Sequence, residues 1–377
     1  MLLPSPVVSQ TALTGDADDP RALIVIFLRG AADGLTLVAP LLDEDYQRAR
    51  PRLRVSPRDA LPLDGFFGLN PLLAPLHSLY TDGTLAIVHA AGSEDTTRSH
   101  FEAQDLMEHG GVTAGGWLGR FLRYRPRTRH GALSAIAVGR ELPLSLRGAP
   151  AATAMQSIDD FSLGNDRLAG ALALLYGGER NMIGEAGRET LAALARIEKL
   201  RGTPYVPEHG ATYGRDDFAQ GLMQLARLLK ARVGLEAASI DLGGWDSHFT
   251  QGAVIDPLMA KLSGGLAAFA RDMGPRMATT TVVVMTEFGR RVAENASFGT
   301  DHGRGSVMFV MGGGVHGGRV LGSWPGLTGS TLEGPGDLPV TTNYRRVLAP
   351  ILARLGATDT LSKIFPGQII EPLPVYG

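Results

Sequence analysis

The chain has 377 residues, of which 44% are hydrophobic and 20% are charged, values that are typical of a folded globular protein. Its formal net charge is -2 and its pI is about 6.5, which argues against a broad basic surface for nucleic acid or anionic lipid. It has no cysteine, which excludes disulfides, thiolate metal ligands and a cysteine nucleophile. We therefore expect a protein with a large core and no nucleic-acid partner.

The first 20 residues are predicted to be a flexible lead-in, because Ser, Thr, Asp and Pro are frequent in them. They lack the basic start and the continuous apolar stretch of a secretory signal peptide. No apolar run approaches the roughly 20 residues that span a bilayer, so no membrane span is expected. We expect a cytoplasmic protein as this chain stands, or a periplasmic one if a leader is missing.

Short β-branched and apolar runs recur along the chain, each bounded by Gly, Pro or Asp. They predict strands at residues 22–28, 84–90, 133–138, 237–242, 280–285 and 306–311. The runs are nearly continuous in apolar residues rather than alternating, which is typical of parallel strands that are covered on both faces.

Helical patterns lie between these strands, at residues 101–108, 168–200, 218–233 and 257–273, with a break near 177–178 in the second. Strands that alternate with helices predict an α/β fold with a mostly parallel sheet and helices on both faces. We expect residues 21–377 to form one domain, in which residues 160–215 are a helical insertion or a cap.

In open α/β sheets, ligands bind beyond the carboxyl ends of the strands. Asp33 follows the first predicted strand, where a carboxylate is well placed to hold a cation, although a turn Asp that bonds its own backbone is the simpler alternative. Ser99 stands at the start of the helix after the second strand. Capping is the commonest use of a hydroxyl there, but the same position favours an anion. Beside a metal and Arg98, Ser99 could attack a phosphoryl or sulfuryl group.

Two further loops carry acids and imidazoles. Asp246 and His248 lie two apart on a loop that opens with two glycines, and carboxylate and imidazole suit Zn, Mn and Fe. The alternative is an Asp that only orients the His. Glu287 ends a wholly apolar strand, which is costly unless the carboxylate is paired or bound. Arg290 could be that partner, or it could clamp an anion with two parallel hydrogen bonds.

The last polar loop holds Asp301 and His302 between glycines, just before the strand at residues 306–311. Acids and imidazoles thus stand at four successive strand ends. That convergence predicts a metal site.

These residues resemble a known family. The resemblance rests on the stretches LRGAADGLTLVAP, LDGFFGLNPLLAPLHSLYTDGTLAIVHAAG, RSHFEAQD, GGWDSH, TEFGRR and GTDHGRG, which are similar to the bacterial domain-of-unknown-function family 1501. That family resembles the alkaline phosphatase-like superfamily, which includes sulfatases and cofactor-independent phosphoglycerate mutases. The resemblance runs from about residue 22 to about residue 325, so the expected fold is an alkaline phosphatase-like α/β sandwich.

The superfamily pattern implies two metal ions. In that pattern, Asp33 corresponds to the first ligand and Ser99 to the nucleophile. Asp246 and His248 correspond to an Asp/His pair, and His302 corresponds to the final His. Glu287 falls where an Asp-His dipeptide would put its Asp, but Phe288 stands in place of the His. The second ion therefore loses a ligand unless His100 or Asp301 replaces it. The spacing of the Asp/His pair is also short, and Asp241 is an alternative for its Asp. One metal ion, a harder ion such as Mg or Mn, and no metal all remain open.

The leading functional hypothesis is a hydrolase of a phosphate or sulfate ester. It would use one or two divalent ions (Zn, Mn or Mg), with Ser99 as nucleophile and Arg98 or Arg290 as a clamp on the ester oxygens. His100 would protonate the leaving group. The substrate would be a small or oligomeric anionic ester. A non-catalytic binding or assembly protein is the second hypothesis, favoured by Phe288. A transferase or mutase, with residues 160–215 as its cap, is the third.

Overall fold

The computed structural model describes residues 21–125, 131–160 and 166–377, so the predicted flexible segment 1–20 lies outside the described residues. Within these residues, nine strands form one sheet in the order β11-β5-β10-β9-β1-β8-β6-β7, and β12 pairs with β5. The strands are β1 (Ala22–Arg29), β5 (Leu85–Gly92), β6 (Ala135–Val138), β7 (Thr153–Met155), β8 (Ala237–Gly243), β9 (Thr280–Thr286), β10 (Ser306–Gly312), β11 (Val320–Leu321) and β12 (Thr342–Asn343).

The sheet is mostly parallel, as predicted. β1 pairs in parallel with β8 and β9, and β6 does so with β7 and β8. Only β10 departs from the prediction, because it runs antiparallel to both β5 and β9. No crossover helix separates β9 from β10, and an antiparallel return does not need one.

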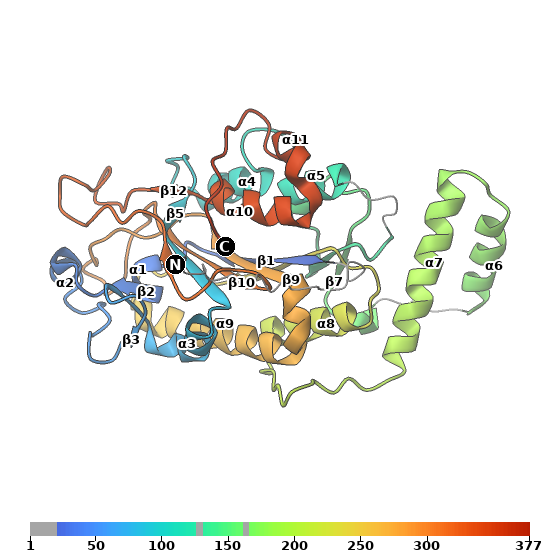
Figure 1. The fold of residues 1–377 in the computed structure, drawn as a ribbon, viewed down its shortest axis with the longest axis horizontal. Coiled ribbons are helices and arrows are strands. Elements are labelled where there is room, and N and C mark those ends of the chain that lie inside the picture. The colour runs from blue at the N-terminus through green and yellow to red at the C-terminus, as the bar shows by residue number, and fades with distance from the viewer. Residues whose placement is uncertain (1–20, 126–130, 161–165) are drawn as a thin grey trace, which may run out of the picture.

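Helices cover both faces of the sheet, which confirms the predicted α/β architecture (Figure 1). On one face lie α3 (Ala74–Thr81), α8 (Asp217–Lys230) and α9 (Gln251–Met273), and on the other lie α4 (His100–His109), α5 (Trp117–Tyr124), α10 (Tyr344–Leu352) and α11 (Leu361–Ile364). Successive residues of β1 point to opposite faces, so Ile24 and Ile26 enter one apolar cluster and Val25 and Phe27 the other. Burying such a side chain contributes about 1.5–3 kcal/mol, which explains the continuous apolar runs.

Smaller elements lie beside the carboxyl end of β1. They are α1 (Gly34–Leu37), α2 (Glu44–Ala49) and a three-stranded sheet of β2 (Val38–Pro40), β4 (Phe67–Leu69) and β3 (Leu61–Pro62). Asp43 caps α2 by accepting hydrogen bonds from the backbone of Asp45 and Tyr46. These elements bring Arg50, at the end of α2, into the interior.

The predicted break near residues 177–178 is present between α6 (Asp166–Gly177) and α7 (Met182–Arg201). The two helices pack on each other and stand apart from the sheet, at the right of Figure 1. Near its end α7 joins the core through Ala193 and Ile197. That these residues act as a cap stays a prediction.

One helical segment of the described chain, Gln251–Thr279, is long and apolar enough to cross a membrane by length and composition. Most of it is α9, which places Leu262, Leu266 and Phe269 in the same apolar cluster as α8. Core helices pass the same test, and the packing of α9 accounts for its composition. Asp256 and Lys261 interrupt its apolar residues, so the sequence contains no continuous apolar run of this length.

A buried histidine on β5, beside the edge strands β11 and β12, gives the fold a dependence on pH. His89, on β5, is 2% exposed and stacks on Phe67 with ring centroids 4.9 Å apart. Its Nδ1 accepts a hydrogen bond from the backbone N–H of Ala90 (2.8 Å), so the ring carries its proton on Nε2, which donates to the carbonyl of Val38 (2.9 Å). Burial lowers the pKa of His89 to about 4.

Because the pKa of His89 is lower in the folded chain than in the unfolded one, the unfolded state takes up the proton first as the pH falls. We therefore expect the free energy of unfolding to decrease from about pH 6.5 down to about pH 4, by up to about 3 kcal/mol. Urea unfolding of the wild type and of His89→Gln across this range measures it. His77→Gln, at a partly exposed histidine on α3, should keep the wild-type profile. An unchanged profile in His89→Gln would contradict the assignment.

Candidate functional site

The direction of each strand decides which loops meet. β1, β5, β8 and β9 all end at one edge of the sheet, and the antiparallel β10 starts there. The loops after the four parallel strands therefore face the loop of residues 300–305, which precedes β10. This edge holds most of the residues that the sequence analysis selected.

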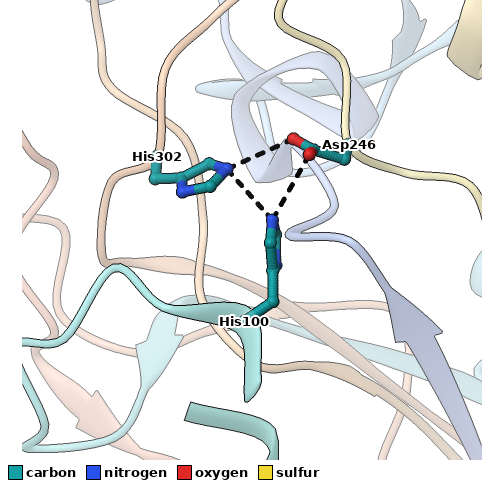
Figure 2. Close-up of side chains that lie close together, drawn as sticks. All are labelled: His100, Asp246 and His302. Atoms are coloured by element: carbon teal, nitrogen blue, oxygen red, sulfur yellow. Dashed lines mark hydrogen bonds and ion pairs between the residues drawn. The ribbon is translucent and has the colours of Figure 1, made fainter. Parts of the chain in front are cut away.

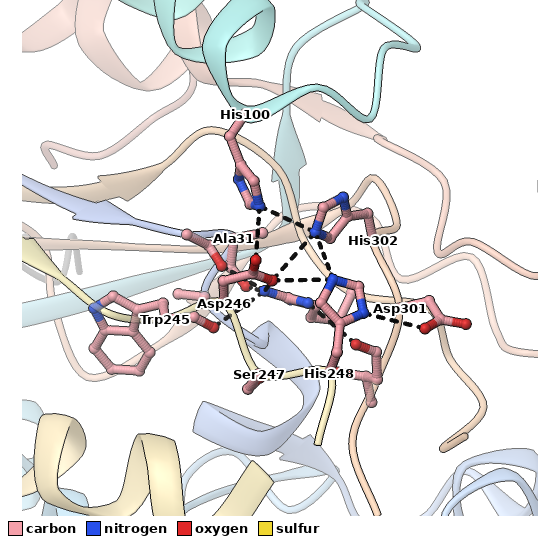
Figure 3. A network of polar contacts seen from close by, with 12 residues as sticks. Ala31, His100, Trp245, Asp246, Ser247, His248, Asp301 and His302 are labelled. Atoms are coloured by element: carbon pink, nitrogen blue, oxygen red, sulfur yellow. Dashed lines mark hydrogen bonds and ion pairs between the residues drawn. The ribbon is translucent and has the colours of Figure 1, made fainter. Parts of the chain in front are cut away.

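Three of them form the closest group. One ligand atom each of His100, Asp246 and His302 lies within 4.8 Å of the other two (Figure 2). The Nε2 atoms of His100 and His302 are 3.0 Å apart, and Asp246 Oδ1 is 3.2 Å from His302 Nε2. His248 joins this group, since its Nε2 is 2.9 Å from His302 Nε2 and 3.1 Å from Asp246 Oδ1 (Figure 3). We call these four residues the histidine cluster.

An outer acceptor orients each imidazole of the histidine cluster. His100 Nδ1 lies 2.7 Å from Glu287 Oε1, His302 Nδ1 2.9 Å from the carbonyl of Arg98, and His248 Nδ1 3.2 Å from Asp301 Oδ1. A carbonyl or carboxylate oxygen can only accept, so each Nδ1 carries a hydrogen. In the neutral rings, the three Nε2 atoms then turn bare lone pairs toward one another and toward Asp246.

Lone pairs that face one another at about 3 Å repel unless a cation or a proton lies between them. Imidazoles that donate their outer N–H to a carboxylate or a carbonyl are the usual arrangement around protein-bound metals. The donor set of imidazole nitrogen and one carboxylate oxygen suits Zn, Mn or Fe. The residues present therefore fit a divalent metal ion.

Asp246 stays ionised in this setting. Burial alone would raise its pKa, but Arg290 and His302 outweigh burial and lower the pKa to about 2. For His302 the balance is reversed, since burial lowers the pKa of the imidazole more than its contacts with the Arg98 carbonyl and Asp246 raise it. A carboxylate and a neutral imidazole are the protonation states that bind metals.

Glu287 is 1% exposed and supports this arrangement from the interior of the protein. Its Oε1 accepts hydrogen bonds from the backbone N–H groups of Gly30 (2.9 Å) and Ala31 (3.1 Å), and from the Gln104 side chain (3.0 Å). Burial would raise the pKa of Glu287, but the bonds from His100 and Gln104 hold it below its usual value. The predicted partner of Glu287 was a metal or Arg290, whereas the structure gives it His100, Gln104 and two backbone amides.

Arg290 is fully buried, and backbone carbonyls occupy most of its guanidinium. It donates to the carbonyls of Ala31 (2.8 Å), Gly30 (2.6 Å), Trp245 (3.1 Å) and Thr300 (3.1 Å), and its Nη2 also donates to Asp246 Oδ1 (2.7 Å). Nη2 shares its two hydrogens among three of these acceptors, and the guanidinium is fully buried, so Arg290 faces protein groups rather than solvent. Arg290 therefore holds neighbouring loops together, and its guanidinium does not take the position of the predicted anion clamp.

Asp33 lies apart from the histidine cluster and is 1% exposed. Both of its oxygens accept from Arg50, with Nη1–Oδ2 at 2.5 Å and Nη2–Oδ1 at 3.0 Å. Thr36 and Gln251 also donate to Oδ2 (2.6 Å each). Burial would raise the pKa of Asp33, but Arg50 overrides burial and lowers it. The structure thus gives this predicted metal ligand a buried ion pair.

Ser99 is the N-cap of α4, with Glu102 N at 3.5 Å from its Oγ. This is the capping alternative of the sequence analysis, although the contact is at the outer limit for a hydrogen bond. The predicted clamp Arg98 directs its guanidinium to the buried Asp337 and contributes to the site through its backbone carbonyl.

Phe288, which occupies the expected place of a ligand, packs against the cluster. Its ring is 5% exposed and stacks on His100 with centroids 5.0 Å apart, and it lies 5.2 Å from His302.

The sequence analysis did not predict three contributors to the site: the packing of Phe288, the ion pair of Arg50, and the hydrogen bonds of Gln104. The position of Gln104, four residues after His100 on one helix, was the available signal, because such residues share a helix face.

If Asp33 is structural, Asp33→Asn should leave the charge of Arg50 buried and unpaired. We expect it to lower the free energy of unfolding by about 3–5 kcal/mol and to leave the metal content of the folded chain unchanged. Urea unfolding and elemental analysis of the same preparation measure the two quantities. Asp59→Asn, at an exposed acid nearby, is the control. Loss of metal with little loss of stability would make Asp33 a ligand.

Comparisons with known proteins give a family without an assigned activity. The model of the family described as "Protein of unknown function (DUF1501)" matches residues 171–359, just over half of the chain. No curated protein matches the sequence.

Three solved structures match this chain, each at 10% identity. The C-terminal periplasmic domain of EcEptC from Escherichia coli, in complex with Zn, matches with a TM-score of 0.36 over 78% of this chain and 73% of that one. A 2-O GAG sulfatase matches with a TM-score of 0.38 over 90% and 71% of the two chains. A putative sulfatase from Bacteroides thetaiotaomicron matches with a TM-score of 0.37 over 95% and 77%.

Proposed function

Because the chain belongs to the family described as "Protein of unknown function (DUF1501)", we propose its function from the site itself: a metal-dependent hydrolase of a phosphate or sulfate ester. The observation that carries the proposal is the convergence of three imidazole Nε2 atoms on the Asp246 carboxylate, each ring held by an outer acceptor. Such a set costs free energy without a cation at its centre, so a metal ion is the simplest reason for it.

One ion of a borderline metal fits this donor set better than Mg. Three nitrogen donors and one carboxylate are the ligands that Zn, Mn and Fe accept, whereas Mg prefers oxygen ligands and retained waters. In the described residues, the histidine cluster is the one such group of side chains. Asp33, which the two-metal pattern requires, is neutralised by Arg50. We therefore propose one Zn or Mn ion per chain.

The charges of the site favour an anionic substrate. Arg290 offsets the charge of Asp246, and the imidazoles are neutral as ligands. A divalent ion would thus leave the site positive. When bound, the ion would supply Lewis-acid polarisation of the ester oxygens and a lower pKa for a hydroxyl beside it. The side chains of Asp246 and His248 are 46% and 32% exposed, so an ester can reach the cluster from solvent.

The start of α4 supports the same chemistry. Among the described residues, the backbone N–H groups of His100 and Phe101 have no acceptor, and both lie in the first turn of a ten-residue helix. Free amides at a helix N-terminus bind ester oxygens and the charge that develops on them. Ser99 stands at this turn with only a 3.5 Å capping contact, so we propose its hydroxyl as the nucleophile.

A non-catalytic metal- or anion-binding protein is the second candidate. The observation that favours it is that Arg98 and Arg290, the two predicted clamps, are occupied by Asp337 and by backbone carbonyls. The two candidates share the metal ion and differ in turnover.

The proposed metal site predicts the metal content of its variants. We expect about one Zn or Mn ion per wild-type chain, and at least a tenfold weaker affinity in His302→Ala and His100→Ala, because each removes a ligand. Glu287→Gln should weaken binding by about 10–100-fold, since it alters the group that orients His100. Elemental analysis and competition with a chelator measure these values.

His77→Ala serves as the matched control for these variants, because His77 is a partly exposed histidine whose hydrogen bond among the described residues is with the Pro62 carbonyl. It should keep the wild-type affinity. Equal metal content in wild type, His302→Ala and His100→Ala would remove the metal from the proposal.

The nucleophile has a separate test. Ser99→Asn keeps a capping side chain but has no hydroxyl, so α4 should remain capped. We expect it to lower kcat for para-nitrophenyl phosphate or sulfate by about a thousandfold or more, with unchanged metal content. Ser99→Thr, which keeps both the hydroxyl and the cap, should retain part of the activity. Wild-type kcat in Ser99→Asn would leave the hydrolase but exclude Ser99, and no turnover by the metal-loaded wild type would favour the binding protein.

A further inference from the structure

A groove of about 650 Å³ lies beside the histidine cluster, at the same edge of the sheet. One wall is α4, where His100, Gln104 and Glu108 follow at intervals of four residues and so lie along one face. His100 reaches the cluster, whereas Gln104 and Glu108 line the groove. The other wall consists of the loop after β6 and the end of β8. Four residues of helix span about 6 Å, so the groove begins within one turn of the cluster.

Hydrogen bonds connect this wall to the cluster. Gln104 accepts a bond from Arg29 Nη1 (3.0 Å) and donates to Glu287 Oε1 (3.0 Å), which in turn holds His100 (2.7 Å). Arg29 also pairs with Glu108 and Asp241, at 2.6 Å each. The inner part of the groove is therefore a rigid, paired surface that adjoins the group that orients His100.

The outer part carries unpaired cations. Arg140 and Arg147 line the groove, both are exposed, and neither guanidinium has a hydrogen bond or an ion pair with another described residue. Arg147 also lines an adjoining hollow of about 470 Å³, together with Leu142 and Pro143, which the two cavities share. Among the residues that line this hollow, Arg147 is the one with a charge.

Unpaired acids line the same groove as these arginines. Asp105 on α4 and Glu141 beside Arg140 line the groove, both are exposed, and they have no partner among the described residues. They would repel a substrate that is anionic along its whole length. They tolerate one whose negative charges are confined to its two ends.

We propose, on the basis of the proposed hydrolase function, that the substrate is an elongated molecule with two separated anionic groups. The scissile ester lies at the histidine cluster, a neutral body lies in the groove, and the second phosphate, sulfate or carboxylate binds Arg147, with Arg140 beside it. A free arginine binds such oxoanions with two parallel hydrogen bonds. Arg140 and Arg147 are thus specificity residues, and the reacting bond lies elsewhere.

The test compares two series of probes on the metal-loaded protein: linear alkane-α,ω-diol bisphosphates of four to twelve carbons, and the monophosphates of the same alcohols. We expect kcat/KM for the best bisphosphate to exceed that of the matched monophosphate by at least tenfold, with an optimum chain length. In Arg147→Gln the ratio should fall to about one, and in Arg140→Gln it should fall in part. Arg58→Gln, at an exposed arginine whose guanidinium has no partner among the described residues and which does not line the groove, should keep the wild-type ratio.

Calorimetric binding of the same probes separates this proposal from the hydrolase proposal. If the wild type turns over no ester but binds the bisphosphate at least tenfold more tightly than the monophosphate, and Arg147→Gln removes the difference, the groove proposal stands without the hydrolase. If mono- and bisphosphates are bound and hydrolysed alike, or if Arg147→Gln keeps the wild-type preference, the groove proposal is wrong whatever the activity.

Discussion

The buried guanidinium of Arg290 lies where the loops after β1, β8 and β9 meet, and the geometry of the site depends on it. It binds the carbonyls of Gly30 and Ala31 after β1 and that of Trp245 after β8, together with the carboxylate of Asp246. These loops could not otherwise approach so closely, because each would bury unpaired carbonyl groups. A buried arginine satisfies several of them at once. Removing it would leave both the carbonyls and Asp246 without their partner.

With the loops held in this way, the outer acceptors set the direction of each imidazole. Glu287 is the most connected of them, since it receives two backbone amides of the β1 loop, Gln104 and His100. Phe288 adds a flat apolar surface on which the His100 ring rests. Buried groups thus pre-organise the site, and the Nε2 atoms of the imidazoles converge in the absence of substrate. Pre-organisation of this kind is what gives protein metal sites their affinity and geometry.

Buried and exposed charged groups differ in their pairing at this edge of the sheet. Carboxylates that lie deep in the protein are paired: Asp33 with Arg50, and Glu287 with its amide donors. The unpaired charges lie outside, along the groove that begins at Gln104 and ends at Arg147. Recognition of the far end of a substrate at the free arginines of this groove would therefore be independent of the chemistry at the ester.

The sequence alone predicted six of the nine strands that the described residues form in the main sheet, the two-sided burial of that sheet and the loops that carry the site, because continuous apolar runs and polar strand ends are local patterns. It also identified His100, Asp246, His248 and His302 as candidate site residues, although they come from three separate segments of the chain. Only the tertiary structure decided their roles. The antiparallel course of β10, a matter of non-local pairing, brought His302 to the carboxyl edge. Arg50, 17 residues after Asp33, entered the core and neutralised that acid, whereas Arg290 turned inward to backbone carbonyls. A residue's type states which bonds it can form, and the folded chain determines which partners are within reach.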